Sequence, residues 1–380
     1  MIALRETECC ALAGTYCRPP PLRRRVSRPQ LKRDPLGRII TLRGVPTALE
    51  LPMRYAGVAV AIVFAPSLAA QAVLDTPSGR YEVIGLEQWT LGALQDSLAA
   101  HGESLTSHAC AAVLRSKLGF PDAAVVTYLG RSGRSQRYTE IMVVEPQDSA
   151  RVQYLPLPTD SAAERHEWLD GISLIRRNAN LISFLLSHLQ ILYAANPPDS
   201  LFRRSPDSEL FRAFLANHTT AADLRLAGWT IRNDKNLDNV IVAAFILGSP
   251  SGWPATSADL VAALRNPIQP ASVTAASLLE YLIGTARVPV DWDAFVPTFH
   301  ALLDGTNLFA YRAISALLEE APPPRPVGRR LLEGGGHVPL SRLEASDSLV
   351  HASAYRLLKR LTAYDLPPDA AAWRRALASR

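Results

Sequence analysis

Between residues 80 and 158 the spacing of apolar positions changes from that of a strand to that of a helix and back again. Residues 80–86 alternate between polar and apolar side chains, which predicts a strand. Thr90 is a suitable N-cap, and apolar residues then recur at helical spacing. Leu91, Leu94 and Leu98 form this apolar face. The segment therefore begins with a strand followed by a helix.

A second helix and two more strands are predicted downstream. Apolar residues recur at helical spacing over 106–118, and Gly119 ends this helix. Residues 123–129 and 138–144 read as strands joined by a turn-rich segment, and Pro146 stops the second of them. The predicted order is strand, helix, helix, strand, strand.

Three short motifs in this unit resemble those of POTRA domains, small periplasmic modules. They are Gly85 with Thr90 after the first strand, residues 118–123 entering the second strand, and residues 143–146 closing the third. The resemblance implies one sheet with an open edge that pairs with an extended peptide. A plain small α/β domain remains the alternative interpretation of the same residues.

After Pro158 the pattern becomes helical and stays so. Residues 164–193 carry apolar residues at helical spacing and predict one helix, which Arg176 and Arg177 mark as buried or amphipathic rather than membrane-spanning. A loop follows over 194–206.

Four later segments look alike, because each begins with an aliphatic residue and carries alanines where helices approach closely. They start at Val240, Val273, Leu308 and Leu349, with separations of 33, 35 and 41 residues. Partner helices are predicted before them, as at 259–265 and 291–303. Asn307 and Ser272 are suitable caps, and Gly248 and Gly284 suitable stops. The period resembles that of HEAT-type repeats, which implies stacked helix pairs over 208–380.

The N-terminal part contains a second methionine with the features of a signal peptide. Met53 and Arg54 precede an apolar run over 58–64, and Ala70-Gln71-Ala72 has the A-x-A arrangement of a cleavage site. We therefore interpret 53–72 as a signal peptide and 1–52 as a disordered basic leader. Two explanations of the leader remain open: translation that starts at Met53, or a real cytoplasmic tail with 53–72 as an anchor.

Charge and cysteine usage agree with export. Residues 1–52 carry 10 basic and 4 acidic residues, whereas residues 53–380 carry 30 and 31. The folded part thus lacks the basic excess of a nucleic-acid-binding protein, and we expect no nucleic-acid partner. Cys9, Cys10 and Cys17 precede Met53, so the mature chain keeps Cys110 alone and cannot form an internal disulfide.

No residue set in the sequence specifies a reaction. The eight histidines are scattered, and His108 and Cys110, two apart on one helix, point to different sides. Gly334–Gly336 with His337 reads as an inter-helix loop rather than an oxyanion loop. Asp291 and Asp293 read as helix-start residues. We accordingly predict no catalytic, cofactor-binding or metal-ligating residues and no cofactor.

The predicted fold class is α+β, a small β-α-α-β-β domain followed by an all-α HEAT-like solenoid. The predicted parts are a leader (1–52), a signal peptide (53–72), a POTRA-like domain (73–158), a connecting helix and loop (159–207) and the solenoid (208–380). We expect a periplasmic or secreted, non-enzymatic scaffold that binds a protein or peptide. A membrane-tethered envelope assembly factor and an enzyme with a site assembled from scattered residues remain alternatives.

Overall fold

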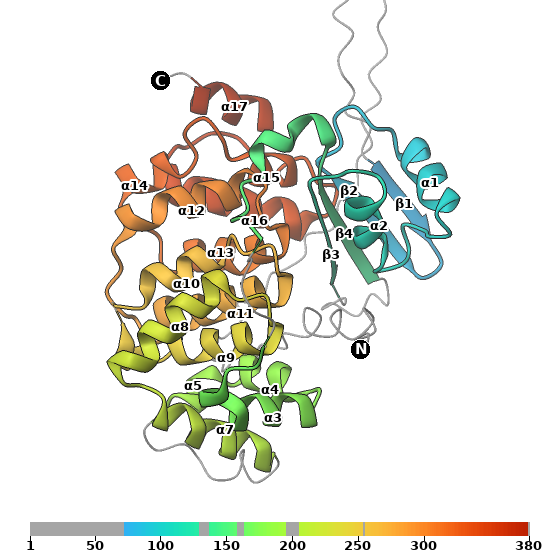
Figure 1. Ribbon diagram of the computed structural model, residues 1–380. Helices are drawn as coiled ribbons and strands as arrows, with labels where there is room; N and C mark the ends of the chain where they lie inside the picture. The colour runs from blue at the N-terminus through green and yellow to red at the C-terminus, as the bar shows by residue number, and fades with distance from the viewer. Residues whose placement is uncertain (1–71, 129–136, 158–162, 195–204, 254, 379–380) are drawn as a thin grey trace, which may run out of the picture. The chain divides into compact units, whose positions relative to one another are not determined.

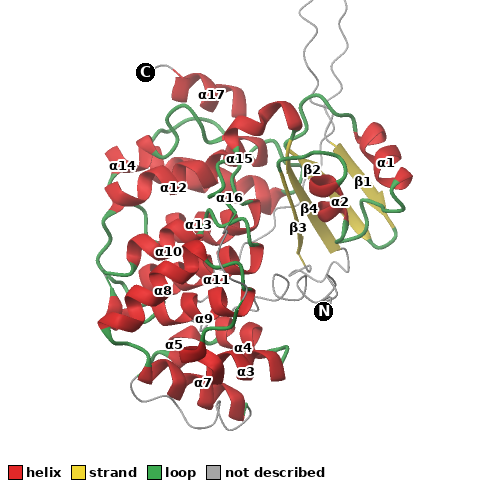
Figure 2. Ribbon diagram, in the orientation of Figure 1, coloured by secondary structure: helices red, strands yellow, loops and turns green. Residues whose placement is uncertain are grey.

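A four-stranded mixed sheet followed by many helices makes up the described part of the chain (Figure 1, Figure 2). The computed structural model describes residues 72–128, 137–157, 163–194, 205–253 and 255–378, which belong to one compact unit. The α+β prediction is confirmed at this level. The predicted leader, residues 53–71 and the three N-terminal cysteines lie outside the described residues.

The sheet contains one strand more than predicted. The strands are β1 (Ala72–Thr76), β2 (Gly79–Ile84), β3 (Asp122–Tyr128) and β4 (Arg137–Val144). Their order is β1-β2-β4-β3, with β2 and β4 parallel and the other two pairs antiparallel. The prediction missed β1 because its five residues show no clear alternation. A turn of only two residues joins it to β2.

Two glycines allow β2 to lie against β4 at both ends. Gly79 has φ +140°, and a Cβ atom there would lie 2.1 Å from the carbonyl oxygen of Arg137. Gly85 has φ +96°, and its Cβ would lie 2.3 Å from the carbonyl oxygen of Val143. A side chain at either position would force the parallel strands apart.

One face of the sheet is covered by α1 (Leu91–Ala100) and α2 (Cys110–Ser116). The Thr90 side chain accepts a hydrogen bond from the N–H of Ala93 and caps α1, as predicted. Helix α2 is shorter than the predicted 106–118. The buried cluster beneath both helices includes Val83, Leu94, Leu98, Cys110, Leu114, Val125, Ile141 and Val143.

The opposite face packs against the helical region. Ala124, Val126, Met142 and Val144 point to this side and belong to the helical core. Strand β3 contacts α13 (Leu308–Glu320), and Val144 lies beside Gly305 in the turn before that helix. The sheet is therefore buried on both faces.

The remaining elements follow in chain order. The first group is η2 (Pro146–Arg151), η3 (His166–Trp168), α3 (Leu169–Arg177), α4 (Leu181–Ser187), α5 (Leu189–Leu192), α7 (Pro206–Asn217), α8 (Ala221–Asn233), α9 (Leu237–Leu247) and η4 (Pro250–Gly252). The second is α10 (Ser257–Ala263), α11 (Gln269–Leu279), η5 (Glu280–Thr285), α12 (Trp292–Asp304), α14 (Arg325–Arg330), α15 (His337–Arg342), α16 (Ser348–Thr362) and α17 (Ala370–Ala378).

Helices from α8 onward pack in successive pairs. The pairs α8/α9, α10/α11, α12/α13 and α14/α16 are each in contact. Along one row α8 contacts α10, α10 contacts α12 and α12 contacts α14. Along the other, α9 contacts α11, α11 contacts α13 and α13 contacts α16. Each pair thus buries its apolar sides against the neighbouring pairs.

The prediction of a single helix over 164–193 is wrong, because the segment forms three helices, α3, α4 and α5. Asn178 follows α3 with extended backbone (φ −127°, ψ 97°), and its side chain accepts a hydrogen bond from the N–H of Asn180. Arg177 and Asn178 both donate to the Asp207 carboxylate. These polar contacts end the helix inside an apolar run.

If the repeated segments stack, the residues that open them should be buried, and this is confirmed in part. Val240, Leu308 and Val350 are buried, whereas Val273 is only half-buried and Leu349, just before Val350, is exposed. Asn307 caps α13 and Gly248 ends α9 as predicted. Two other predictions are wrong.

Ser272 lies inside α11, where its hydroxyl donates to the carbonyl of Gln269 instead of capping the helix. Gly284 does not stop a helix, because the π-helical segment η5 continues to Thr285.

Candidate functional site

Three buried carboxylates lie on the sheet face that packs against the helical region. They are Glu82 on β2, Glu140 on β4 and Asp122 on β3. Glu82 and Glu140 are partners in the parallel register, so they lie side by side on neighbouring strands. Two acidic groups this close and this buried require partners of their own.

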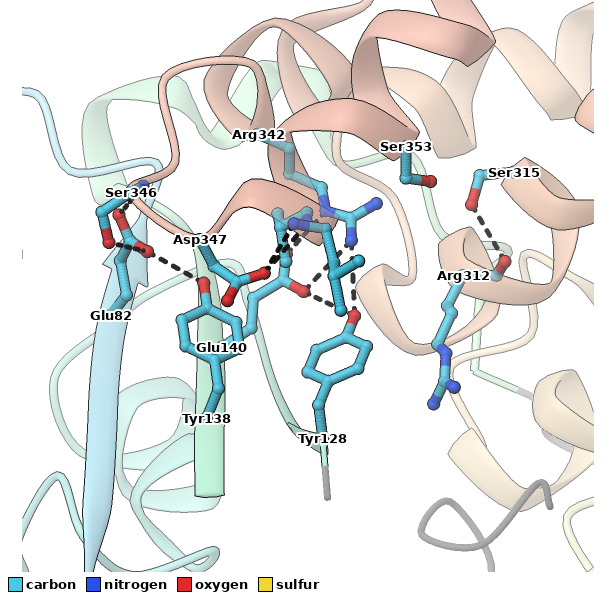
Figure 3. Close-up of polar contacts among 12 residues, drawn as sticks. Glu82, Tyr128, Tyr138, Glu140, Arg312, Ser315, Arg342, Ser346, Asp347 and Ser353 are labelled. Carbon is cyan, nitrogen blue, oxygen red and sulfur yellow. Dashed lines mark hydrogen bonds and ion pairs between the residues drawn. The ribbon is translucent and has the colours of Figure 1, made fainter. Parts of the chain in front are cut away.

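Glu140 is paired with an arginine from the far end of the chain (Figure 3). Arg342 Nε lies 2.6 Å from Glu140 Oε1, and Arg342 also donates to Oε2 over 3.2 Å. The Tyr128 hydroxyl donates to the same Oε2 over 2.8 Å. Arg342, which ends α15, is only 4% exposed. The pair is a bidentate, fully buried ion pair between the sheet and the helical region.

Glu82 is held by the loop between α15 and α16 (Figure 3). Its Oε1 accepts the backbone N–H of Ser346 over 2.7 Å, and its Oε2 accepts the Ser346 hydroxyl over 2.8 Å. Tyr138 donates its hydroxyl to Oε2 over 2.9 Å. Three donors therefore satisfy the Glu82 carboxylate, which has no cation in contact with it among the described residues.

Asp122 on β3 forms a hydrogen bond to the start of α13. Its Oδ2 accepts the N–H of Leu308 over 3.0 Å and the hydroxyl of Tyr154 over 2.8 Å. Its Oδ1 accepts the N–H of Ala123, and Arg115 Nη1 lies 4.0 Å away. Burial raises the pKa of Asp122 above its ordinary value, although these donors and Arg115 act in the opposite direction.

The electrostatics keep the neighbouring groups in fixed protonation states. Burial, reinforced by Glu140, raises the pKa values of the Tyr128 and Tyr138 hydroxyls, so both stay protonated as donors. Burial is the largest single influence on Arg342 and would lower its pKa, but Glu140 together with Tyr311 and Tyr128 outweighs it and raises this pKa well above its ordinary value. Tyr128, Tyr138 and Arg342 therefore stay protonated near neutral pH.

The arrangement joins two parts of the fold and leaves no reactive group free. Every carboxylate oxygen of Glu82, Glu140 and Asp122 accepts at least one hydrogen bond. A group that acts on a substrate must be reachable by it, and these three side chains are at most 2% exposed. We infer that the contacts of Glu82, Asp122 and Glu140 serve to fix the sheet in position against the helical region.

The residues considered for chemistry in the sequence do not come together. Cys110 is fully buried as the first residue of α2, whereas His108 lies before that helix, is exposed and has its Nε2 3.2 Å from the Thr127 hydroxyl. Asp291 caps α12 by accepting the N–H of Ala294, and Asp293 lies in its first turn. The predicted loop at Gly334–Gly336 ends with Gly336 in the left-handed region (φ +78°), directly before α15.

One acid–base pair was not predicted. His337 Nδ1 is hydrogen-bonded to Asp304 at the end of α12. His337 also lines a small pocket beside Arg151 and Ser341. The pair links α12 to α15, the helix that carries Arg342.

The outer edge of β1 is the second feature of interest. Within the described residues β1 pairs with β2 alone, so it is an edge strand. Thr76 and Gly79 flank the turn as the first hydrogen-bonded pair, and pairs alternate from there. The register therefore directs the backbone N–H and C=O groups of Val73 and Asp75 outward.

Sequence reasoning missed the buried carboxylates, although one signal was present. Glu140 directly precedes the apolar end of β4, and Glu82 directly precedes that of β2, and both lie at positions that face inward. A charge at such a position predicts a buried partner. Its identity is not readable, because Arg342 lies 202 residues from Glu140.

No protein family, curated protein or solved structure matches this chain. In the described ranges no group of three or more His, Cys, Asp or Glu side chains is placed to hold a metal ion. Of the helices described, none is both long enough and apolar enough to cross a membrane.

Proposed function

We propose that this protein is an exported, non-enzymatic scaffold that binds an extended peptide segment of a partner protein at the outer edge of β1. The observation that carries the proposal is an edge strand with outward backbone groups at Val73 and Asp75, on a sheet that is buried on both faces. Strand addition at such an edge supplies main-chain hydrogen bonds without a preformed cavity.

The rigid attachment of the sheet supports this function. An added strand gains affinity when the edge it joins is already ordered, because less conformational entropy is lost on binding. The buried contacts of Glu82, Asp122 and Glu140 fix the sheet to the helices. The POTRA-like interpretation of residues 73–158 agrees with the same binding mode.

The helical part is proposed to be a HEAT-like solenoid that offers further binding surface. Neighbour-to-neighbour contacts along both rows of helices support this interpretation. The irregular spacing of 33, 35 and 41 residues and the additional short helices α14 and α15 depart from a regular repeat.

Export to the periplasm or beyond rests on residues 53–72 and on the basic leader before them. N-terminal sequencing of the native protein should find a mature start close to Val73. Recovery of intact residues 1–52 would instead favour the membrane-tethered assembly factor.

The edge can be tested with two substitutions at one position. Asp75→Pro removes an outward N–H, and proline is tolerated at such a position of an edge strand, whereas Asp75→Ala keeps this N–H and loses the same ion pair to Arg80. We expect phage-displayed random heptapeptides to be enriched on the wild-type protein and on Asp75→Ala but not on Asp75→Pro. Circular dichroism and thermal unfolding of both variants would establish that the sheet is intact. Equal enrichment on Asp75→Pro would exclude this edge as the binding site.

A further inference from the structure

A polar pocket lies where α2 of the sheet unit meets α11 and α13 of the helical region. Its volume is about 120 Å³. Arg115, Tyr154, Asn266, Gln269, Asn307 and Phe309 are among the residues that line it. It is separate from the outer edge of β1.

Arg115 is the one charged side chain among the described residues that line this pocket. Its Nη1 donates to the carbonyl of Ala123 over 2.7 Å, and the guanidinium lies 5.7 Å from the centre of the Phe309 ring. These contacts hold the side chain while leaving other N–H groups of the guanidinium for a ligand.

The acid closest to Arg115 is already engaged elsewhere. Asp122 accepts hydrogen bonds from Leu308, Tyr154 and Ala123 and lies 4.0 Å from the guanidinium. Burial favours its neutral form by raising its pKa. The positive charge of Arg115 is therefore incompletely compensated on the pocket side.

Two asparagine side chains that line the pocket are held in place by their own hydrogen bonds. Asn266 donates to the carbonyl of Ile231 and accepts the N–H of Ile268, and Asn307 donates to the carbonyl of Leu264 while capping α13. The first turn of α11 borders the pocket at Gln269 and has no side-chain cap, so its positive end adds to the field of Arg115.

We propose that this pocket binds a small oxyanion, a carboxylate or phosphate group, through charge-assisted hydrogen bonds from Arg115. The fixed amide groups and the Phe309 ring would orient the remainder of the ligand. Because Arg115 belongs to the sheet unit and Gln269 to the helices, a bound anion would contact both parts at once. The inference is independent of peptide binding at β1.

The test is isothermal titration of the full chain with inorganic phosphate, with acetate and with chloride at equal ionic strength and pH 7. We expect phosphate or acetate to bind and chloride to give no signal. Arg115→Gln should weaken binding by about tenfold or more, since one charge-assisted contact is lost. Lys117→Gln is the matched control, because it removes the same charge from an exposed position at the end of the same helix.

A second variant keeps Arg115 and the packing around it. Gln269→Glu places a carboxylate at the pocket and should also reduce binding at least about tenfold, through like-charge repulsion. Gln190→Glu, at an exposed position, should have no effect. If only phosphate binds, the natural ligand carries a phosphate group. If acetate binds as well, ligands that carry a carboxylate group also fit the pocket. The proposal would be overturned if neither phosphate nor acetate bound, or if Arg115→Gln and Gln269→Glu both bound the anion with wild-type affinity.

Discussion

The two faces of the sheet are buried in different ways. The face beneath α1 and α2 is sealed by aliphatic side chains such as Val83, Leu98 and Ile141. The face toward the helical region combines apolar residues with Glu82, Asp122 and Glu140, each satisfied by specific donors. Apolar contacts tolerate small shifts, whereas bidentate and multi-donor contacts require one relative position. We expect the first face to supply stability and the second to set how the two parts fit together.

The largest effect should come from separating the buried ion pair. Arg342→Met leaves Glu140 buried without its cation and should lower the free energy of unfolding by about 3–5 kcal/mol. Urea denaturation measures this loss.

The double variant Glu140→Leu with Arg342→Met is the matched control. It replaces both charges by apolar groups and should recover most of the lost stability. A double variant as unstable as Arg342→Met alone would show that lost packing, not the uncompensated carboxylate, causes the effect.

The next effect contrasts the two faces directly. Leu98→Ala should cost about 3 kcal/mol by leaving a cavity under α1, but Leu98→Met, which conserves volume, should cost less than about 1.5 kcal/mol. Arg342→Lys conserves charge but cannot reproduce the bidentate contact, so it should be the more damaging conservative change. Thermal unfolding of the three variants measures these losses. A larger loss of stability in Leu98→Met than in Arg342→Lys would contradict our interpretation.

A smaller effect is expected at Glu82, where the partners are neutral. Glu82→Gln keeps an acceptor for the Ser346 N–H but weakens the contacts to the Ser346 and Tyr138 hydroxyls, at a cost of about 1–2 kcal/mol. Glu87→Gln, at an exposed position of the same unit, should change stability by less than about 0.5 kcal/mol. Indistinguishable unfolding curves for Glu82→Gln and Glu87→Gln would show that Glu82 does not help to fix the sheet to the helices.

The smallest effect is a change in pH dependence. Burial raises the pKa of Asp122 above 3.8, so the folded chain holds this proton more tightly than the unfolded chain. The stability from this group is complete below about pH 3.8 and is lost as pH rises toward the folded pKa. Relative to Asp122→Asn, the wild type should therefore become less stable as pH increases from 4. A relative gain over the same range would mean that Arg115 and the hydrogen-bond donors outweigh burial.

Local patterns predicted much of the sheet unit and the repeated helices. Strands β2, β3 and β4, the cap at Thr90 and the buried positions Val240 and Leu308 follow from periodicity and capping chemistry. These features depend on residues close together in the chain.

What could not be predicted depends on distant partners. The break at Asn178 depends on Asp207, and the burial of Glu140 depends on Arg342. The free edge of β1 follows from the strand order, which a single strand pattern does not reveal.

The distance along the chain between Glu140 and Arg342 has a consequence for biosynthesis. At about 5–20 residues per second, the ribosome needs roughly 10–40 s to add the 202 residues that separate them. Because an unpaired carboxylate is costly to bury, we expect Glu82 and Glu140 to keep this face of the unfinished sheet hydrated until Arg342 and Ser346 are available. Inward-pointing charges of this kind also disfavour association between sheets, so the same acidic groups should limit aggregation of the incomplete chain.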